Sequence, residues 1–144
     1  MKTMKYGLIL LNVLFPLFTW AQGQAHLTFH MGFGANNQFV VGGTIENPGD
    51  TPVARGYIVI LPVNKRCEPL PFLTQAYGPI PPKGKVEFKI PITETQFEHY
   101  RLAGFAAFDD MGFALPAIDE TKDIILARQP KEIEECQINR HPPQ

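Results

Sequence analysis

The sequence predicts an all-β fold, an antiparallel β-sandwich of about seven strands with one disulfide. First, its 14 prolines and 12 glycines recur at short intervals and leave little room for helices of ordinary length. Second, the segments between them are rich in β-branched and aromatic residues and recur at a spacing of roughly ten residues. Third, the chain has two cysteines, and an even number favours a disulfide in an exported protein.

Residues 1–21 have the three regions of a secretory signal peptide. Lys2 and Lys5 precede an apolar run, and small residues lead up to Ala21. We expect cleavage after Ala21, with a cut after Ala25 as the alternative. The apolar run is too short to predict a membrane anchor, and we expect no stable membrane insertion of the protein after signal cleavage.

Residues 22–138 are expected to form one domain, and residues 139–144 a disordered tail. Cleavage removes two lysines and leaves 11 basic residues against 14 acidic ones, a formal charge of −3. This balance argues against nucleic acid or an anionic membrane as a partner, because both attract clustered Lys and Arg. We therefore expect a periplasmic or secreted protein.

The first predicted strands lie at residues 26–31 and 38–46. Residues 47–50 follow as a type II turn, in which Gly49 would need a positive φ. The run 56–61 is apolar on both faces, as in a strand at the centre of a sheet.

The second half of the domain begins with a long connection, residues 62–82, which contains six prolines and has room for one short edge strand at 72–77. Strict alternation predicts a half-buried strand at 85–92, and a two-sided apolar strand follows at 100–108. Residues 109–112 form a hairpin turn.

The segment from Asp119 to Gln137 is less regular. Ile124–Leu126 predicts an edge strand, and residues 130–136 a short helical turn. A bond between Cys67 and Cys136 would close a loop of about 70 residues and stabilise the fold by roughly 4 kcal/mol.

The block from Val41 to Ile92 contains an ordered series of motifs. A glycine-containing strand that ends in Asn precedes a Gly-Asp turn, a small apolar pair, a second apolar strand and a Pro-x-Gly turn. The segments are Val41–Asn47, Gly49–Asp50, Pro52–Val53, Tyr57–Leu61 and Pro82–Gly84. This series resembles the FxLYD-type, immunoglobulin-like domains of bacterial cell-envelope and secreted proteins. Pro62 and Val63 stand where that family has its aromatic-Asp pair, and the likeness covers less than half of the chain.

The resemblance implies an immunoglobulin-like β-sandwich that acts as an adhesive, spacer or protein-binding module, and it carries over no catalytic residue. In size, export signal and predicted fold, the chain is also similar to small periplasmic proteins of intrinsic carbapenem resistance. Antibiotic self-protection, or sequestration of a small ligand, is therefore the alternative function.

Side chains suited to catalysis are few. The sequence contains no serine, which excludes serine nucleophiles. Asp109 and Asp110 are adjacent in a turn and point apart, which disfavours a role as a general acid and general base acting together. The sequence therefore predicts a protein that is not an enzyme and needs no cofactor.

A copper site is the second alternative. His26 and His30 share one face of the first strand, and Met31 is adjacent. The set is short of ligands, because nothing in the sequence places His99 or His141 nearby. We expect no metal site, with His26, His30 and Met31 as the candidates if one exists.

Phe72 and Tyr77 are the candidate partner-binding residues. They lie in the connection stiffened by prolines, where exposed rings would form an apolar contact surface. The sequence therefore predicts a binding module that contacts a protein partner through loops or a sheet edge.

Overall fold

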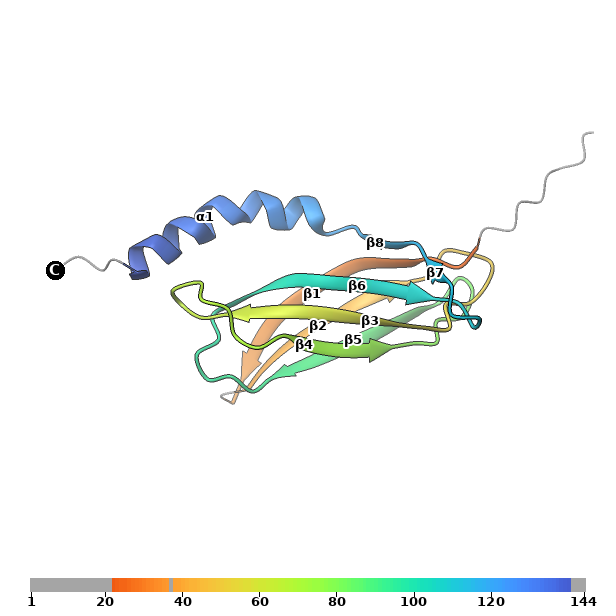
Figure 1. The fold of residues 1–144 in the computed structure, drawn as a ribbon, viewed down its shortest axis with the longest axis horizontal. Helices are drawn as coiled ribbons and strands as arrows, with labels where there is room; N and C mark the ends of the chain where they lie inside the picture. The colour runs from red at the N-terminus through yellow and green to blue at the C-terminus, as the bar shows by residue number, and fades with distance from the viewer. Residues whose placement is uncertain (1–21, 37, 141–144) are drawn as a thin grey trace, which may run out of the picture.

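The computed structural model describes residues 22–36 and 38–140 (Figure 1). The expected signal peptide, residues 1–21, and residues 141–144 lie outside the described residues. Two sheets are stacked face to face, and one long helix runs along their side (Figure 1). The elements are β1 (Ala25–Ala35), β2 (Gln38–Glu46), β3 (Arg55–Val63), β4 (Leu73–Tyr77), β5 (Lys85–Ile92), β6 (His99–Phe108), β7 (Ala114–Leu115), β8 (Ala117–Asp119) and α1 (Lys122–Arg140).

The strand order confirms the predicted sandwich. One sheet has the order β5-β2-β1-β8 and the other β4-β3-β6-β7. All pairs are antiparallel except β1 with β8. The first three consecutive strands are divided between the two sheets, as in immunoglobulin-like sandwiches.

The end of the strand region changes sheets at Pro116. Before it, β7 pairs with the last two residues of β6, and after it β8 pairs with Ala25–Leu27 of β1. Among the described residues, β1 beyond Leu27 and β6 before Ala107 have no strand on that side. The two sheets therefore have open edges on the same side of the sandwich, and α1 runs past them (Figure 1).

The core fills the space between the sheets with alternating residues of β1, β2, β3 and β5. Its largest fully buried side chains include Leu27, Ile45, Ile58 and Ile60. Because side chains alternate across a strand, one face of each sheet supplies this core while the other faces outward.

The turn at residues 47–50 is not the type II turn that we expected. Gly49 does not have a positive φ. A Cβ there would lie 2.2 Å from the carbonyl oxygen of Gln22, so the glycine allows the N-terminal segment to pass closely. The turn is centred instead on Asn47, whose side-chain oxygen accepts hydrogen bonds from the backbone N–H groups of Gln24 and Gly49 at 3.1 and 3.0 Å.

The C-terminal segment is also different from the expectation. The predicted edge strand at Ile124–Leu126 is wrong, because one 19-residue helix spans this segment. Residues 130–136 are helical as expected, but they belong to that long helix and not to a short turn. A three-residue apolar run cannot distinguish strand from helix. Asn139 and Arg140 belong to this helix and not to the predicted tail. No helix of the described part is long and apolar enough to cross a membrane.

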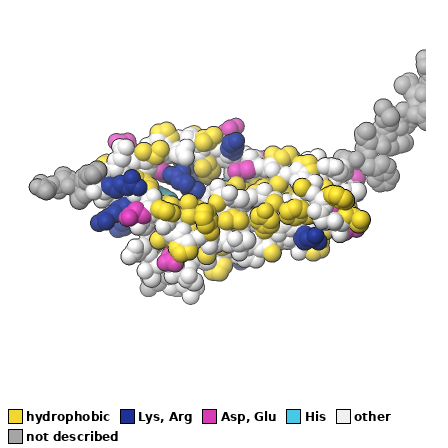
Figure 2. Space-filling model, in the orientation of Figure 1, with side chains coloured by type: hydrophobic (Ala, Val, Ile, Leu, Met, Phe, Trp, Pro, Cys, Tyr) yellow, Lys and Arg dark blue, Asp and Glu magenta, His cyan; other side chains and the backbone are white. Residues whose placement is uncertain are grey.

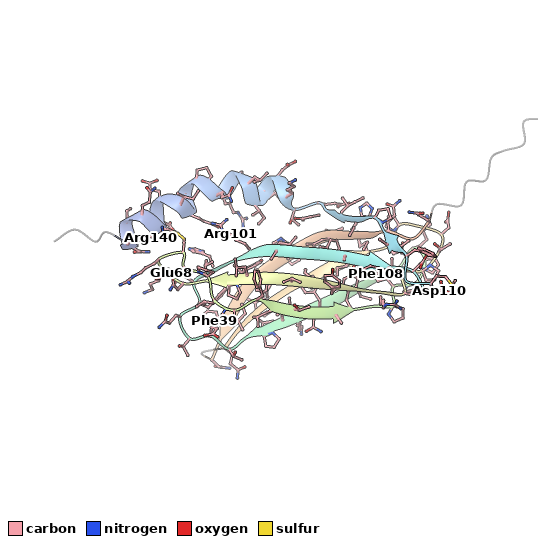
Figure 3. The ribbon with its side chains drawn as sticks, viewed as in Figure 1. Phe39, Glu68, Arg101, Phe108, Asp110 and Arg140 are labelled. Atoms are coloured by element: carbon pink, nitrogen blue, oxygen red, sulfur yellow. A yellow bond between two sulfur atoms is a disulfide. The ribbon has the colours of Figure 1, made fainter. Side chains whose placement is uncertain are left out.

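The predicted disulfide between Cys67 and Cys136 is confirmed, with a Cα–Cα distance of 5.6 Å. It joins the last turns of α1 to the loop after β3. Two hydrogen bonds support the same junction, from Asn139 Nδ2 to the carbonyl of Lys65 at 2.9 Å and from Arg140 Nε to the carbonyl of Arg66 at 2.7 Å. Figure 3 shows Arg140 beside the loop that carries Glu68.

Candidate functional site

The outward face of the β4-β3-β6 sheet is apolar over several rows of side chains. Register places Thr74, Val59 and Gly104 in one row. The next row consists of Ala76, Tyr57 and Ala106. Figure 2 shows hydrophobic side chains gathered in a band along this face.

An arginine limits this apolar face at each end. Arg101 pairs with Leu61 beyond one row, and Arg55 pairs with Phe108 beyond the other. The Tyr57 and Phe108 rings lie 6.1 Å apart, and Tyr57 is 41% exposed. A flat, uncharged region lies between the two arginines, and such surfaces mark sites of protein contact.

Strand β4 forms the border of the apolar face, and its outer edge is unprotected. Its five residues include no charge and no proline. The outer strand of the other sheet, β5, carries the features that prevent strand pairing: Lys85, Glu87, Lys89 and Pro91. Of these two outer strands, β4 is the one that lacks features preventing another strand from pairing with it.

Phe72 and Tyr77 have different environments. Phe72 is 63% exposed just before β4, whereas Tyr77 is 8% exposed and belongs to the core. The Tyr77 hydroxyl donates to the carbonyl of Ala106 at 2.6 Å, and burial raises the pKa of Tyr77. The expectation of an exposed Tyr77 is wrong because the two positions differ by an odd number and so face opposite sides of an extended chain.

The candidate metal ligands have other partners. The ring nitrogens of His26 lie 2.7 Å from Glu120 Oε1 and 2.8 Å from Gln24 Oε1. Met31 is exposed on the outer face of the sheet, one position after His30. The structure therefore does not bring His26, His30 and Met31 together as a ligand set.

His30 instead takes part in a hydrogen-bonded chain that the sequence did not suggest. Its Nδ1 lies 2.6 Å from the Tyr100 hydroxyl, and its Nε2 lies 2.8 Å from Thr121 Oγ1. Thr121 in turn donates to Asp119 Oδ1 at 2.5 Å. Four residues from β1, β6, β8 and the start of α1 thus meet at the open edge of the sandwich.

No family model and no curated protein matches the chain. The resemblance to FxLYD-type domains therefore stays a prediction. Among solved structures, the chain is similar to IrmA from Escherichia coli, with a TM-score of 0.47 and 7% sequence identity. The match covers 69% of this chain and 92% of that chain. A likeness of this extent does not indicate what this chain does.

Proposed function

We propose that the protein is an exported, non-enzymatic binding module that recognises a protein partner through strand β4 and the apolar outer face beside it. One observation carries the proposal: the unprotected edge of β4 is continuous with an uncharged face bounded by Arg55 and Arg101. An unprotected edge strand exposes a protein to aggregation, and retention of one is consistent with a role in binding another strand.

Recognition by strand addition follows from this geometry. An extended segment of the partner would hydrogen-bond to the free backbone groups of β4, and alternate side chains would extend the apolar face. Leu73 pairs with Ile60, so Phe72 lies at the level of Leu61 and would contact the partner's first residues. The prolines before β4 limit the motion of this segment and lower the entropy lost on binding.

Export is supported by the leader and by the disulfide between Cys67 and Cys136, which is typical of oxidising compartments. Cleavage after Ala21 suits the fold better than cleavage after Ala25. The later cut would remove Ala25, which is fully buried, and Gln24, which donates to Asn47.

The proposal is tested by placing a charge on the face. Ala76→Lys adds a lysine on β4, at the edge of the row that contains Tyr57, and Glu87→Lys places a lysine on the outer strand β5 as a control. We expect the wild type and Glu87→Lys to retain a partner from a periplasmic extract, and Ala76→Lys to lose it with an unchanged melting temperature.

Hydrogen exchange in the captured complex shows which strand contacts the partner. The amides of Leu73–Tyr77 should become protected, while those of β5 should not change. Capture that persists in Ala76→Lys, or protection confined to other strands, would contradict the proposal.

Of the alternatives, sequestration of a small ligand has an observation in its favour. A cleft beside α1, whose lining includes no residue of β3 or β4, has the size of a ligand site.

A further inference from the structure

The cleft lies between α1 and the neighbouring open edges of β1 and β6, and its volume is about 390 Å³. Its floor consists of residues 30–34 of β1 and residues 97–100, where the chain enters β6. Ile125, Arg128 and Glu132 of α1 form its roof. A volume of this size lies within the range of small-molecule sites, roughly 300–1,000 Å³.

The helix is held at both ends, which keeps the cleft open between them. At its N-terminal end, Thr121 accepts a hydrogen bond from His30. At its C-terminal end, Cys136 is bonded to Cys67. Between these points the contacts are polar: Arg101 Nη2 lies 3.6 Å from Glu132 Oε2, and α1 has no extensive packing against any described strand.

The hydrogen-bonded chain in the floor has a fixed direction. Because the Thr121 hydroxyl donates to Asp119, its oxygen must accept from His30 Nε2–H. His30 Nδ1 then accepts from the Tyr100 hydroxyl. Tyr100 is left with an oxygen that can accept one further hydrogen bond.

Arg128 is the cation of this cleft. It makes no ion pair with any residue of the described part, and its positive charge acts on both His30 and Tyr100. Burial lowers the pKa of His30, which favours its neutral form. The floor also contains His99, whose Nε2 lies 3.8 Å from Glu135 Oε2. Of the two carboxylates that line the cleft, Glu132 is paired with Arg101 and Glu98 is exposed to solvent.

The rest of the lining is largely apolar and aromatic. The Phe39 ring lies against Gly34 of β1, and the Phe39 and Phe97 rings lie 5.3 Å apart. Ile125 faces them from the helix. A cleft that combines aromatic walls with one free guanidinium is suited to an apolar ligand that carries one negative charge.

We propose that this cleft binds a small monocarboxylate with an apolar or aromatic body, its carboxylate on Arg128 and its body against Phe39 and Phe97. The Tyr100 oxygen would accept a hydrogen bond from a hydroxyl or amide of a ligand that has one. This site is separate from strand β4, so either site can be present without the other.

Three probes of one shape test the charge preference. Phenylpropionate, phenylpropanol and phenylpropylamine differ only in the head group, and NMR titration of the protein measures both affinity and location. We expect phenylpropionate to bind about 10-fold or more tightly than the alcohol, because its carboxylate makes a charge-assisted hydrogen bond to the guanidinium. The amine should bind most weakly, with the shifts confined to residues 30–34, 97–100 and the facing turns of α1.

Two variants with the same change in charge identify the cation. Arg128→Gln should reduce the affinity for phenylpropionate to that for the alcohol, and Lys131→Gln on the same helix should leave it unchanged. Ile125→Trp, which fills the roof, should abolish binding of all three probes.

Several results would overturn the proposal. These are equal affinity for the three probes, equal losses in Arg128→Gln and Lys131→Gln, shifts on the face around Tyr57, and unchanged binding in Ile125→Trp. Absence of phenylpropionate binding at concentrations up to about 10 mM would do so as well.

Discussion

The hydroxyl of Tyr100 lies 2.6 Å from Nδ1 of His30, although the two residues are 70 positions apart in the chain. Their rings meet edge to face, with centroids 5.5 Å apart. The contact joins β1 of one sheet to β6 of the other at the open side of the sandwich. It therefore couples the two sheets and the start of α1 to the protonation of one imidazole.

Stability should decrease as the pH falls below about 6.5. Burial lowers the pKa of His30, the Arg128 charge lowers it further, and Asp119 acts in the opposite direction. The unfolded chain therefore takes up a proton at His30 before the folded chain does. The contribution of His30 to stability is complete when the pH is above 6.5, the ordinary pKa of histidine. It is lost as the pH falls from there toward the lowered pKa of the folded state.

Thermal melts of the wild type and His30→Gln between pH 7.5 and pH 5 check this expectation, since glutamine keeps a donor and an acceptor but does not titrate in this range. The variant should have the smaller decrease in melting temperature. Equal decreases would show that His30 does not contribute.

Asn47→Ala should destabilise the protein by about 2–4 kcal/mol, because it leaves several buried groups without partners. Asn47 is 1% exposed, and its Nδ2 also donates to the carbonyls of Thr51, Ile80 and Pro81. Asn139→Ala, which removes one exposed hydrogen bond, should cost under about 1 kcal/mol. Denaturant unfolding measures both, and similar losses in the two variants would refute the role assigned to Asn47.

Gly49→Ala should destabilise the fold by about 1–3 kcal/mol through overlap with the backbone of Gln22. The cause can be separated from backbone strain by a double change. If residues 22 and 23 are also deleted, the added methyl group no longer meets the Gln22 and Gly23 backbone, and the penalty should become much smaller. A penalty of the same size in the shortened chain would point to the conformation of Gly49 itself.

Removing the disulfide should release α1 before it affects the sandwich. In the double variant Cys67→Ala, Cys136→Ala, hydrogen exchange of the α1 amides should accelerate strongly, while that of β2 and β3 should change little, because the helix packs sparsely on the strands. Mass spectrometry of the unreduced wild type after alkylation should find no free thiol. Equal acceleration in helix and strands would show that α1 is integral to the core.

Local patterns were enough to predict most of the strands. The strict alternation over residues 85–92 corresponds to β5, and the two-sided apolar run after Arg55 to β3 at the centre of its sheet. These signals depend only on neighbours in sequence and on the period of the strand.

The features that form the two candidate sites depend on distant residues. Nothing near His30 indicates that Tyr100 and Thr121 are its partners, and nothing near Arg128 indicates that a cleft lies beneath it. The helix was missed because Pro130 lies inside it and its apolar residues do not form one stripe. The exposure of Phe72 was predictable, whereas the burial of Tyr77 required attention to strand parity.

The bond between Cys67 and Cys136 changes how the molecule would carry a pulling force. Gln22 and Arg140 lie at opposite ends of the described structure (Figure 1), and β8 is attached to β1 through only three paired positions. With the bond intact, tension applied at Arg140 enters the loop after β3 and passes into the central strand of its sheet, bypassing β8. Once the bond is reduced, the same tension would first peel α1 and β8 from the side of the sandwich. The disulfide thus makes the C-terminal end of α1 mechanically firm.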